Sequence, residues 1–344
     1  MGSIGMFLLA NFATLPITGI SINKKNMKTR APINYLGFAP ENITIKDDAL
    51  HQPDKLCHME TWYFNAVFGN NFSMAIVVSV LQVGSRGSLL AGLYLYRDSE
   101  LKVYTRKVCL SEHFHASQEE PFIKMRDEQI LRGRIDNTTG SWIYDVSLKN
   151  DNCGVNLQFT KTAEGWKGHH FLGWWLVIPR LHVQGTITLD GKTINVTGNG
   201  YHDHNIYPIY APFTTKGYHF ARLGGNSLCI TWAVVTKNRF SEGMIAILNQ
   251  GKMNYLKIGS NGINFTVEES MYDRGELIPK IFSLKINNDR LQVNVTMETL
   301  AVHCIRYPTI KYWRYHLRVS GTITLGSFTE KIDSVEISEL MRFC

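Results

Sequence analysis

The chain has 344 residues, of which 36 are lysine or arginine and 29 are aspartate or glutamate, so its formal net charge at pH 7 is +7. Hydrophobic residues make up 44% and charged residues 19%, which suffices for a packed core and excludes a disordered or fibrous chain. The aromatic content of 11% favours β-sheet or a hydrophobic cavity, and the length fits one or two globular domains.

The start of the chain is expected to be an extension ahead of the fold. Residues 5–20 are apolar, as in a secretion signal, but no lysine or arginine precedes them, and polar residues and a proline interrupt them. We therefore interpret residues 1–35 as an N-terminal extension and keep a weak export signal as the alternative. A cytoplasmic or membrane-peripheral location is favoured, since the basic charge allows contact with an anionic membrane.

The first group of chemically active residues is the run His58-Met-Glu-Thr-Trp-Tyr-Phe64. If this run is extended, alternate side chains share one face, so His58, Glu60 and Trp62 point the same way. A carboxylate and an imidazole would then lie beside a large aromatic surface. The alternative is a strand at a barrel rim, in which Glu60 forms a salt bridge or accepts hydrogen bonds from the backbone.

The second group is Gly198-Asn-Gly-Tyr-His-Asp-His-Asn205. Alternation places both glycines, His202 and His204 on the inward face, where the glycines would leave empty volume for a pocket. A bulge at a glycine would instead turn Asp203 inward. The alternative is a linker with polar caps at the end of the first domain.

Metal and cofactor chemistry find little support. His202 and His204, with His58 or Glu60, could supply three ligands to zinc or iron, but only proximity in sequence favours such a site. The six cysteines show no C-x-x-C spacing, and free buried thiols are expected. Nucleotide- and dinucleotide-binding motifs are absent from the sequence. We assign no metal and no cofactor.

An internal repeat indicates the architecture. Val183-Gln-Gly-Thr-Ile-Thr-Leu189 returns as Val319-Ser-Gly-Thr-Ile-Thr-Leu325, a displacement of 136 residues, and Ser-Leu-Lys at residues 147–149 returns at the same displacement. The repeated segments alternate apolar and polar residues between turns rich in glycine and asparagine, as antiparallel strands do. The sequence therefore predicts an all-β chain of two antiparallel barrels, over residues 36–212 and 213–344.

Two further segments near the carboxyl end have alternative interpretations. Lys311-Tyr-Trp-Arg-Tyr-His316 could stack on nucleobases, but we interpret it as a strand with alternating core aromatics and expect no nucleic-acid partner. Asp333–Phe343 is the best helix candidate in the chain, with a strand as the alternative.

The two motifs resemble a known family. The H-x-E-x-W-Y-F and G-x-G-Y-H-D-H-N runs, one domain apart, are similar to those of the tandem-lipocalin carotenoid 1,2-hydratases (hydroxyneurosporene synthases) and AttH-like proteins. The resemblance covers most of residues 36–344 and implies two lipocalin-like barrels side by side, with an apolar ligand pocket between or within them. Members often have two tryptophans where this chain has Thr61-Trp62, and Trp-Gly where it has Ile206-Tyr207.

The resemblance implies an isoprenoid, polyene or lipid ligand and, as a candidate reaction, acid-catalysed hydration of an isolated double bond. A carboxylic acid in an apolar pocket has a raised pKa and keeps its proton near neutrality. Asp203 is the first choice for this acid and Glu60 the second, with His202 or His204 orienting water. The expected ligand-binding residues are His58, Trp62, Tyr63, Tyr201, Asn205 and Tyr207. A carrier that binds without reaction and a cyclase or pericyclase are the alternatives.

Overall fold

The structure is a computed structural model, and it describes residues 40–51, 57–83, 86–170, 173–207, 215–238, 241–250, 254–258, 262–307 and 310–343. The predicted N-terminal extension and the predicted domain boundary at 212/213 lie outside these ranges. Apart from the short 3-10 helices η5 (Ile45–Asp48) and η6 (Ser111–His113), the regular elements of the described chain are strands. In these ranges no helix has the length and hydrophobicity to span a membrane.

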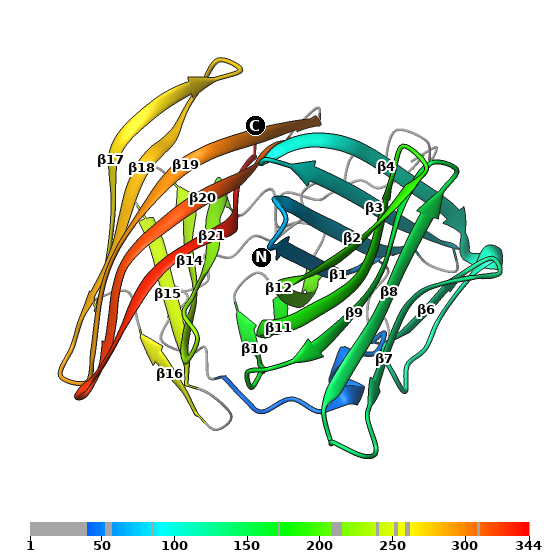
Figure 1. Cartoon of the computed structure of the whole chain (residues 1–344), viewed down its shortest axis with the longest axis horizontal. Coiled ribbons are helices and arrows are strands. Elements are labelled where there is room, and N and C mark those ends of the chain that lie inside the picture. Colours follow the sequence, from blue (N-terminus) through cyan, green and yellow to red (C-terminus); the bar gives the residue numbers. More distant parts are fainter. Residues whose placement is uncertain are drawn as a thin grey trace, which may run out of the picture.

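The first sheet curls into a nearly closed barrel (Figure 1). Its strands pair antiparallel in the order β4-β3-β2-β1-β12-β11-β9-β8-β7-β6-β5, and β10 pairs with β11. The strands are β1 (Cys57–Phe68), β2 (Phe72–Val83), β3 (Arg86–Arg97), β4 (Glu100–Leu110), β5 (Phe114–Ala116), β6 (Phe122–Met125), β7 (Glu128–Ile135), β8 (Trp142–Asn150), β9 (Cys153–Lys161), β10 (Trp166–His170), β11 (Gly173–Leu189) and β12 (Lys192–Tyr207).

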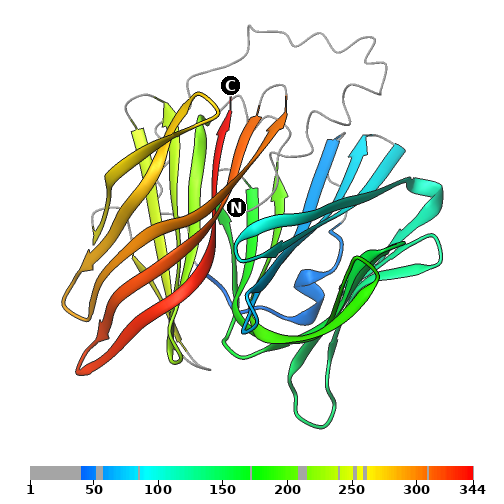
Figure 2. The ribbon, with the colours of Figure 1, turned by 45° about the horizontal axis from the view of Figure 1, so that its top comes forward.

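The second sheet lies beside the first and forms a half-barrel (Figure 2). Its order is β16-β15-β14-β13-β21-β20-β19-β18-β17. The strands are β13 (Gly217–Gly224), β14 (Leu228–Asn238), β15 (Ser241–Gln250), β16 (Asn254–Ile258), β17 (Ile263–Asp273), β18 (Glu276–Asn287), β19 (Leu291–Tyr307), β20 (Ile310–Leu325) and β21 (Phe328–Phe343). The all-β prediction is confirmed, although the second unit is more open than a full barrel.

The two sheets repeat one topology. The first nine strands in the order of the first sheet, β4-β3-β2-β1-β12-β11-β9-β8-β7, correspond one by one to the nine strands of the second sheet, taken in its order from β16 to β17. The repeated heptapeptides lie on the equivalent strands β11 and β20. Within them Gly185 and Gly321 have φ of +144° and +146°, and a Cβ at either would collide with a backbone carbonyl of the neighbouring strand. Both copies therefore require glycine at the same point.

Apolar side chains form three clusters. One fills the first barrel and one fills the half-barrel. The third lies between the two sheets and includes Tyr63, Trp175, Tyr201, Phe220 and Met341. The central strands therefore bury both faces.

The carboxyl-terminal segments are strands. Asp333–Phe343 belongs to β21, so the helix interpretation is wrong. Tyr312, Trp313, Arg314 and Tyr315 of β20 are buried, as the core-strand interpretation predicted. Four cysteines of the described chain are free thiols, of which Cys109 and Cys229 are buried.

Candidate functional site

The two sequence motifs lie on neighbouring strands at the centre of the first sheet. β1 and β12 pair antiparallel without a register shift, with Trp62 opposite His204 and Phe64 opposite His202. The predicted alternation is confirmed because Trp62 and Phe64 belong to the barrel interior while Tyr63 belongs to the cluster between the sheets. The bulge considered for the second motif is absent from this pairing, so Asp203 faces away from His202 and His204.

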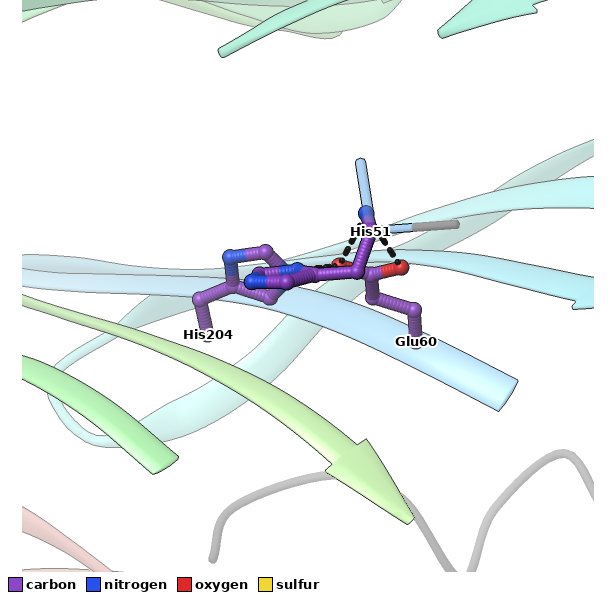
Figure 3. Close-up of side chains that lie close together, drawn as sticks. All are labelled: His51, Glu60 and His204. Carbon is purple, nitrogen blue, oxygen red and sulfur yellow. Dashed lines mark hydrogen bonds and ion pairs between the residues drawn. The ribbon is translucent and has the colours of Figure 1, made fainter. Parts of the chain in front are cut away.

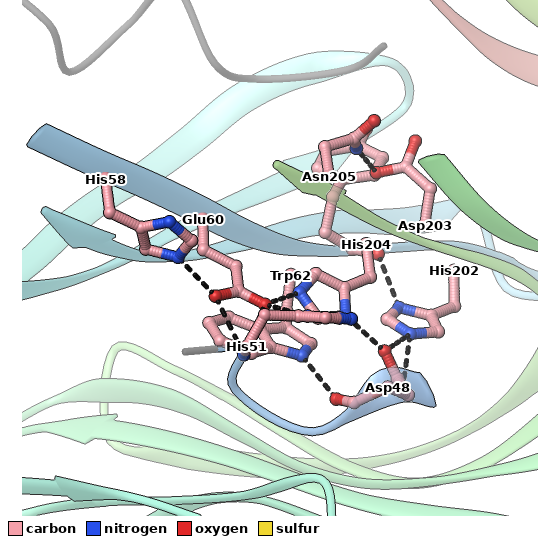
Figure 4. Close-up of polar contacts among 10 residues, drawn as sticks. Asp48, His51, His58, Glu60, Trp62, His202, Asp203, His204 and Asn205 are labelled. Carbon is pink, nitrogen blue, oxygen red and sulfur yellow. Dashed lines mark hydrogen bonds and ion pairs between the residues drawn. The ribbon is translucent and has the colours of Figure 1, made fainter. Parts of the chain in front are cut away.

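The predicted site residues therefore lie on opposite faces of the sheet, and on each face they join residues that were not singled out in the sequence. We call the group inside the first barrel the barrel cluster: Asp48, His51, His58, Glu60, Trp62, His202 and His204. The group between the sheets is the interface cluster: Tyr63, Tyr201, Asp203, Asn205, Tyr207, Arg314 and Glu339. The expectation that Trp62, Tyr63 and Tyr201 border one site is wrong, since the sheet separates Trp62 from the two tyrosines. Figure 4 shows Asp203 and Asn205 turned away from the barrel cluster.

Glu60 is the centre of the barrel cluster. Its carboxylate contacts three imidazoles: His51 Nδ1 at 2.7 Å, His58 Nε2 at 2.7 Å and His204 Nε2 at 2.6 Å (Figure 4). The backbone N–H of His51 also donates to both carboxylate oxygens at 3.2 Å. Burial acts to raise the pKa of Glu60, but the charge of His204 and these hydrogen bonds outweigh burial and hold the pKa well below its usual range. Glu60 is therefore ionised and lacks the raised pKa expected of a hydration acid.

Asp48 is a second buried carboxylate, supplied by η5. It lies 2.9 Å from His204 Nδ1 and 3.0 Å from His202 Nε2, and its backbone carbonyl accepts the Trp62 Nε1–H at 2.9 Å. Trp62 stacks on His204 with ring centroids 4.3 Å apart. Burial acts to lower the pKa of His204, but the charge of Glu60 and hydrogen bonds to both carboxylates raise it to about 9. His204 is thus an imidazolium between two carboxylates.

This arrangement predicts a loss of stability at alkaline pH. The pKa of His204 rises from 6.5 to about 9 on folding, so its contribution is complete below pH 6.5 and disappears as pH rises through 9. The shift corresponds to roughly 3 kcal/mol of unfolding free energy. Urea denaturation in EDTA at intervals from pH 6 to 10 measures it, with His204→Asn as the control that should remove the slope. An equally steep decline in both proteins would contradict this assignment.

The glycines of the second motif do not create the predicted empty volume. A Cβ on Gly200 would lie 2.6 Å from Val183 Cγ2 and 2.9 Å from the Phe159 ring, so those side chains fill the space. A Cβ on Gly198 would collide with the backbone of β1 at Val67. The expected empty volume inside the barrel is therefore absent, because both glycines permit close packing there. Gly198 instead lines a groove outside the barrel cluster.

Asp203 is held as an acceptor in the interface cluster. The Tyr201 hydroxyl donates to its Oδ2 at 2.9 Å and Asn205 Nδ2 donates to its Oδ1 at 2.7 Å. All three side chains are buried. Buried Asp203 therefore has two neutral donors that stabilise its ionised form.

Glu339 is the partner of Asp203 in the second copy, 136 residues further along the chain. Its neighbours on the same face of β21 are Ile337 and Met341, which carry no donor where the first copy has Tyr201 and Asn205. Burial raises the pKa of Glu339, and it outweighs the opposing charge of Arg314 and the hydrogen bonds of Tyr312 and Tyr63. The nearby charge of Asp203 is a smaller cause that also raises this pKa. The interface thus contains two carboxyl groups in unlike surroundings.

Arg314 and aromatic rings surround these carboxyls. Arg314 donates to Glu339 Oε1 at 3.4 Å and to the hydroxyls of Tyr96 and Tyr312 at 3.1 and 3.0 Å. Its guanidinium also lies 4.5 Å from the centroid of the Tyr94 ring, a cation–π arrangement. Three buried oxygens of this region lack a hydrogen-bond partner within the described chain: Asn205 Oδ1, Glu339 Oε2 and the Tyr218 hydroxyl.

A groove opens at one end of the interface. It has a volume of about 570 Å³ and is lined by the ends of β1 and β13 with parts of β12 and β21. Arg222 of its wall donates to the carbonyl of Gly200 at 2.6 Å and through Nε to Glu336 Oε2 at 3.1 Å. One wall residue of the groove thus contacts the backbone next to Tyr201.

Known proteins were compared at the level of sequence and of structure. Neither a protein-family model nor a curated protein sequence matches the chain. The AttH-like protein NE1406 from Nitrosomonas europaea is structurally similar, with a TM-score of 0.63 and 10% identity over 88% of this chain and 97% of that one. The chain has the tandem lipocalin-like fold. Kievitone hydratase from Nectria haematococca is similar with a TM-score of 0.55 and 11% identity over 85% and 90% of the two chains. The predicted resemblance is confirmed for the fold.

Sequence reasoning missed four residues of the two clusters in this tandem lipocalin-like chain. The repeat could have identified Glu339, because a displacement of 136 residues leads to it from Asp203. Arg314 lay in the aromatic stretch that we interpreted as a core strand. Asp48 and His51 precede the first motif in a segment with no distinctive pattern, and only the folded chain brings them to Glu60 and His204.

Proposed function

We propose that the chain binds an apolar isoprenoid-type molecule between its two sheets and hydrates an isolated double bond in it by acid catalysis. The observation that supports this most is the pair of unlike carboxyls, Asp203 and Glu339, buried among aromatic rings. One is stabilised as a carboxylate by two donors, and the other has a raised pKa. Acid and base roles follow from such a difference in surroundings.

In the proposed mechanism Glu339 donates its proton to the less substituted alkene carbon. A C–H bond forms and the π-bond breaks, which leaves a tertiary carbocation. Ring faces of Tyr63 and Tyr201 stabilise this cation, as aromatic faces do for cations generally. A water molecule adds to the cation and gives its extra proton to Asp203. Transfer of that proton to Glu339 restores the starting state, so the net reaction is alkene plus water to tertiary alcohol.

The partnerless oxygens support a polar step in this apolar region. Asn205 Oδ1, Glu339 Oε2 and the Tyr218 hydroxyl are buried, and buried polar atoms are normally satisfied by protein or ordered water. A bound water or a ligand hydroxyl would satisfy them. The hydratase among the similar structures is a second, weaker support, since the likeness concerns the fold.

The residues of the barrel cluster act as positioning groups in this proposal. His202 Nδ1 lies 3.0 Å from the backbone carbonyl of Tyr63, and His204 connects η5 to β1 through its two carboxylate partners. Both histidines therefore hold the strands that carry the interface cluster. Glu60, His58 and Trp62 belong to the same support.

Incubation with geranylgeraniol and squalene in ¹⁸O-labelled water tests the proposed function. Both compounds have trisubstituted double bonds, and mass spectrometry should show a product heavier by one labelled water. The buffer and boiled protein serve as controls. An unchanged lipid recovered from the purified chain, with no labelled product, would contradict catalysis and favour a carrier. A product of unchanged mass would contradict hydration and favour a cyclase.

A further inference from the structure

The barrel cluster brings two imidazoles and a carboxylate together at one point. Donor atoms of His51, Glu60 and His204 all lie within 4.8 Å of one another. Figure 3 shows the two imidazoles and the carboxylate converging from the segment before β1, from β1 and from β12. His51 Nδ1 and His204 Nε2 approach the same oxygen, Glu60 Oε1, at 2.7 and 2.6 Å.

We propose that these three side chains bind a divalent transition-metal ion of the zinc class. Two imidazole nitrogens and one carboxylate oxygen form a common donor set for zinc and for other divalent first-row metals. The ion would take the place of the protons that the carboxylate now shares with the two imidazoles. This site differs from the one considered on sequence alone, because His202 contacts Asp48 and His51 supplies the missing nitrogen.

Groups around the three ligands match the outer shell of a metal site. A metal-binding histidine usually donates its other ring N–H to a carboxylate, which fixes the ring and its tautomer. Asp48 Oδ1 lies 2.9 Å from His204 Nδ1, the nitrogen away from the proposed ion. His58 Nε2 lies 2.7 Å from Glu60 Oε2, the oxygen that neither His51 nor His204 ring nitrogen contacts. The ligands are therefore oriented before any ion binds.

Charge and access also favour an ion at this position. Asp48 and Glu60 are fully buried carboxylates, and buried charges require compensation. A divalent ion supplies two positive charges beside them. The side chain of His51 is 33% exposed, whereas that of Glu60 is fully buried. His51 thus gives the site one solvent-facing edge through which an ion can enter.

Metal content of the protein without an affinity tag tests the proposal. The protein is stripped with EDTA, dialysed against Zn²⁺ and freed of unbound ion, and we expect one equivalent by mass spectrometry. Cobalt(II) in place of zinc should give the intense visible absorption of a four-coordinate site. His51→Ala should lose both signals and His113→Ala, on exposed η6, should keep both. Substitution of His51 leaves its backbone hydrogen bonds to Glu60 in place.

Circular dichroism shows whether His51→Ala is folded. If this variant is unfolded, His51→Asn is used in its place, because an asparagine side chain can still donate a hydrogen bond to Glu60. Equal zinc retention by wild type and the His51 variant would overturn the proposal. Absence of bound zinc and of the cobalt spectrum in the wild type would overturn it as well. Neither readout needs a substrate, so these outcomes are distinct from a failure of the proposed hydration.

Discussion

Replacement of Glu339 by glutamine is expected to slow hydration of geranylgeraniol or squalene by about 10²- to 10⁴-fold, the usual contribution of a general acid. Glutamine has nearly the same shape as glutamic acid but cannot donate a proton to carbon. Burial raises the pKa of Glu339, which favours the protonated form that the proposed step requires. Label incorporation from ¹⁸O-water over time gives the rate.

Two further variants make this result specific. Glu298 occupies an exposed position of the same sheet as Glu339, so Glu298→Gln should leave the rate unchanged. Asp203→Asn removes the group that receives the proton from water and should also slow the reaction. Binding of the alkene, followed by quenching of tryptophan fluorescence, should persist in Glu339→Gln. A rate for Glu339→Gln close to that of Glu298→Gln would refute Glu339 as the acid.

Replacement of Glu60 by glutamine is expected to lower the free energy of unfolding by about 3–5 kcal/mol, as when one partner of a buried ion pair is removed. The neutral amide cannot compensate the charge of His204, and one of its two polar atoms is a donor facing imidazoles that need an acceptor. His51, His58 and His204 all contact this carboxylate. Urea denaturation in the presence of EDTA measures the change without any contribution from metal.

Glu128→Gln is the matched control, because Glu128 is 55% exposed and pairs with Lys107 at the surface. Exposed ion pairs contribute little, so we expect a change within about 1 kcal/mol. A similarly small change for Glu60→Gln would show that the barrel cluster is energetically neutral. It would also remove the basis for the positioning role given to His204.

The fold followed from the sequence because it depends on local alternation and on the repeat. Period-two patterns identified β9, β11 and their second copies, and the shared displacement paired them. The face of each motif side chain was also predictable, as Trp62 and Tyr63 show. These features require only the backbone geometry of strands.

The site was less predictable from the sequence, because it depends on which side chains pack against those faces. Burial of Glu60 was predictable, yet the direction of its pKa shift depends on three imidazoles, one of which comes from the segment before β1. Whether the space beside Gly200 is empty depends on side chains that are far away in the sequence. In the folded chain the ring of Phe159 fills this space. Asp203 and Glu60 were alternative acids on sequence grounds, and the continuous register of β1 with β12 puts them on opposite faces.

One contact between the sheets occurs in both of its equivalent forms. β11 contacts β14, and their counterparts β20 and β2 meet through His316 and Ser73, whose Nε2 and Oγ are 2.8 Å apart. Such exchange of equivalent contacts is the pattern of a symmetric homodimer. In a dimer of identical subunits the two central carboxyls would share one environment and one proton affinity. Covalent fusion lets each copy diverge, so Asp203 in one half accepts hydrogen bonds from Tyr201 and Asn205, while burial raises the pKa of Glu339 in the other.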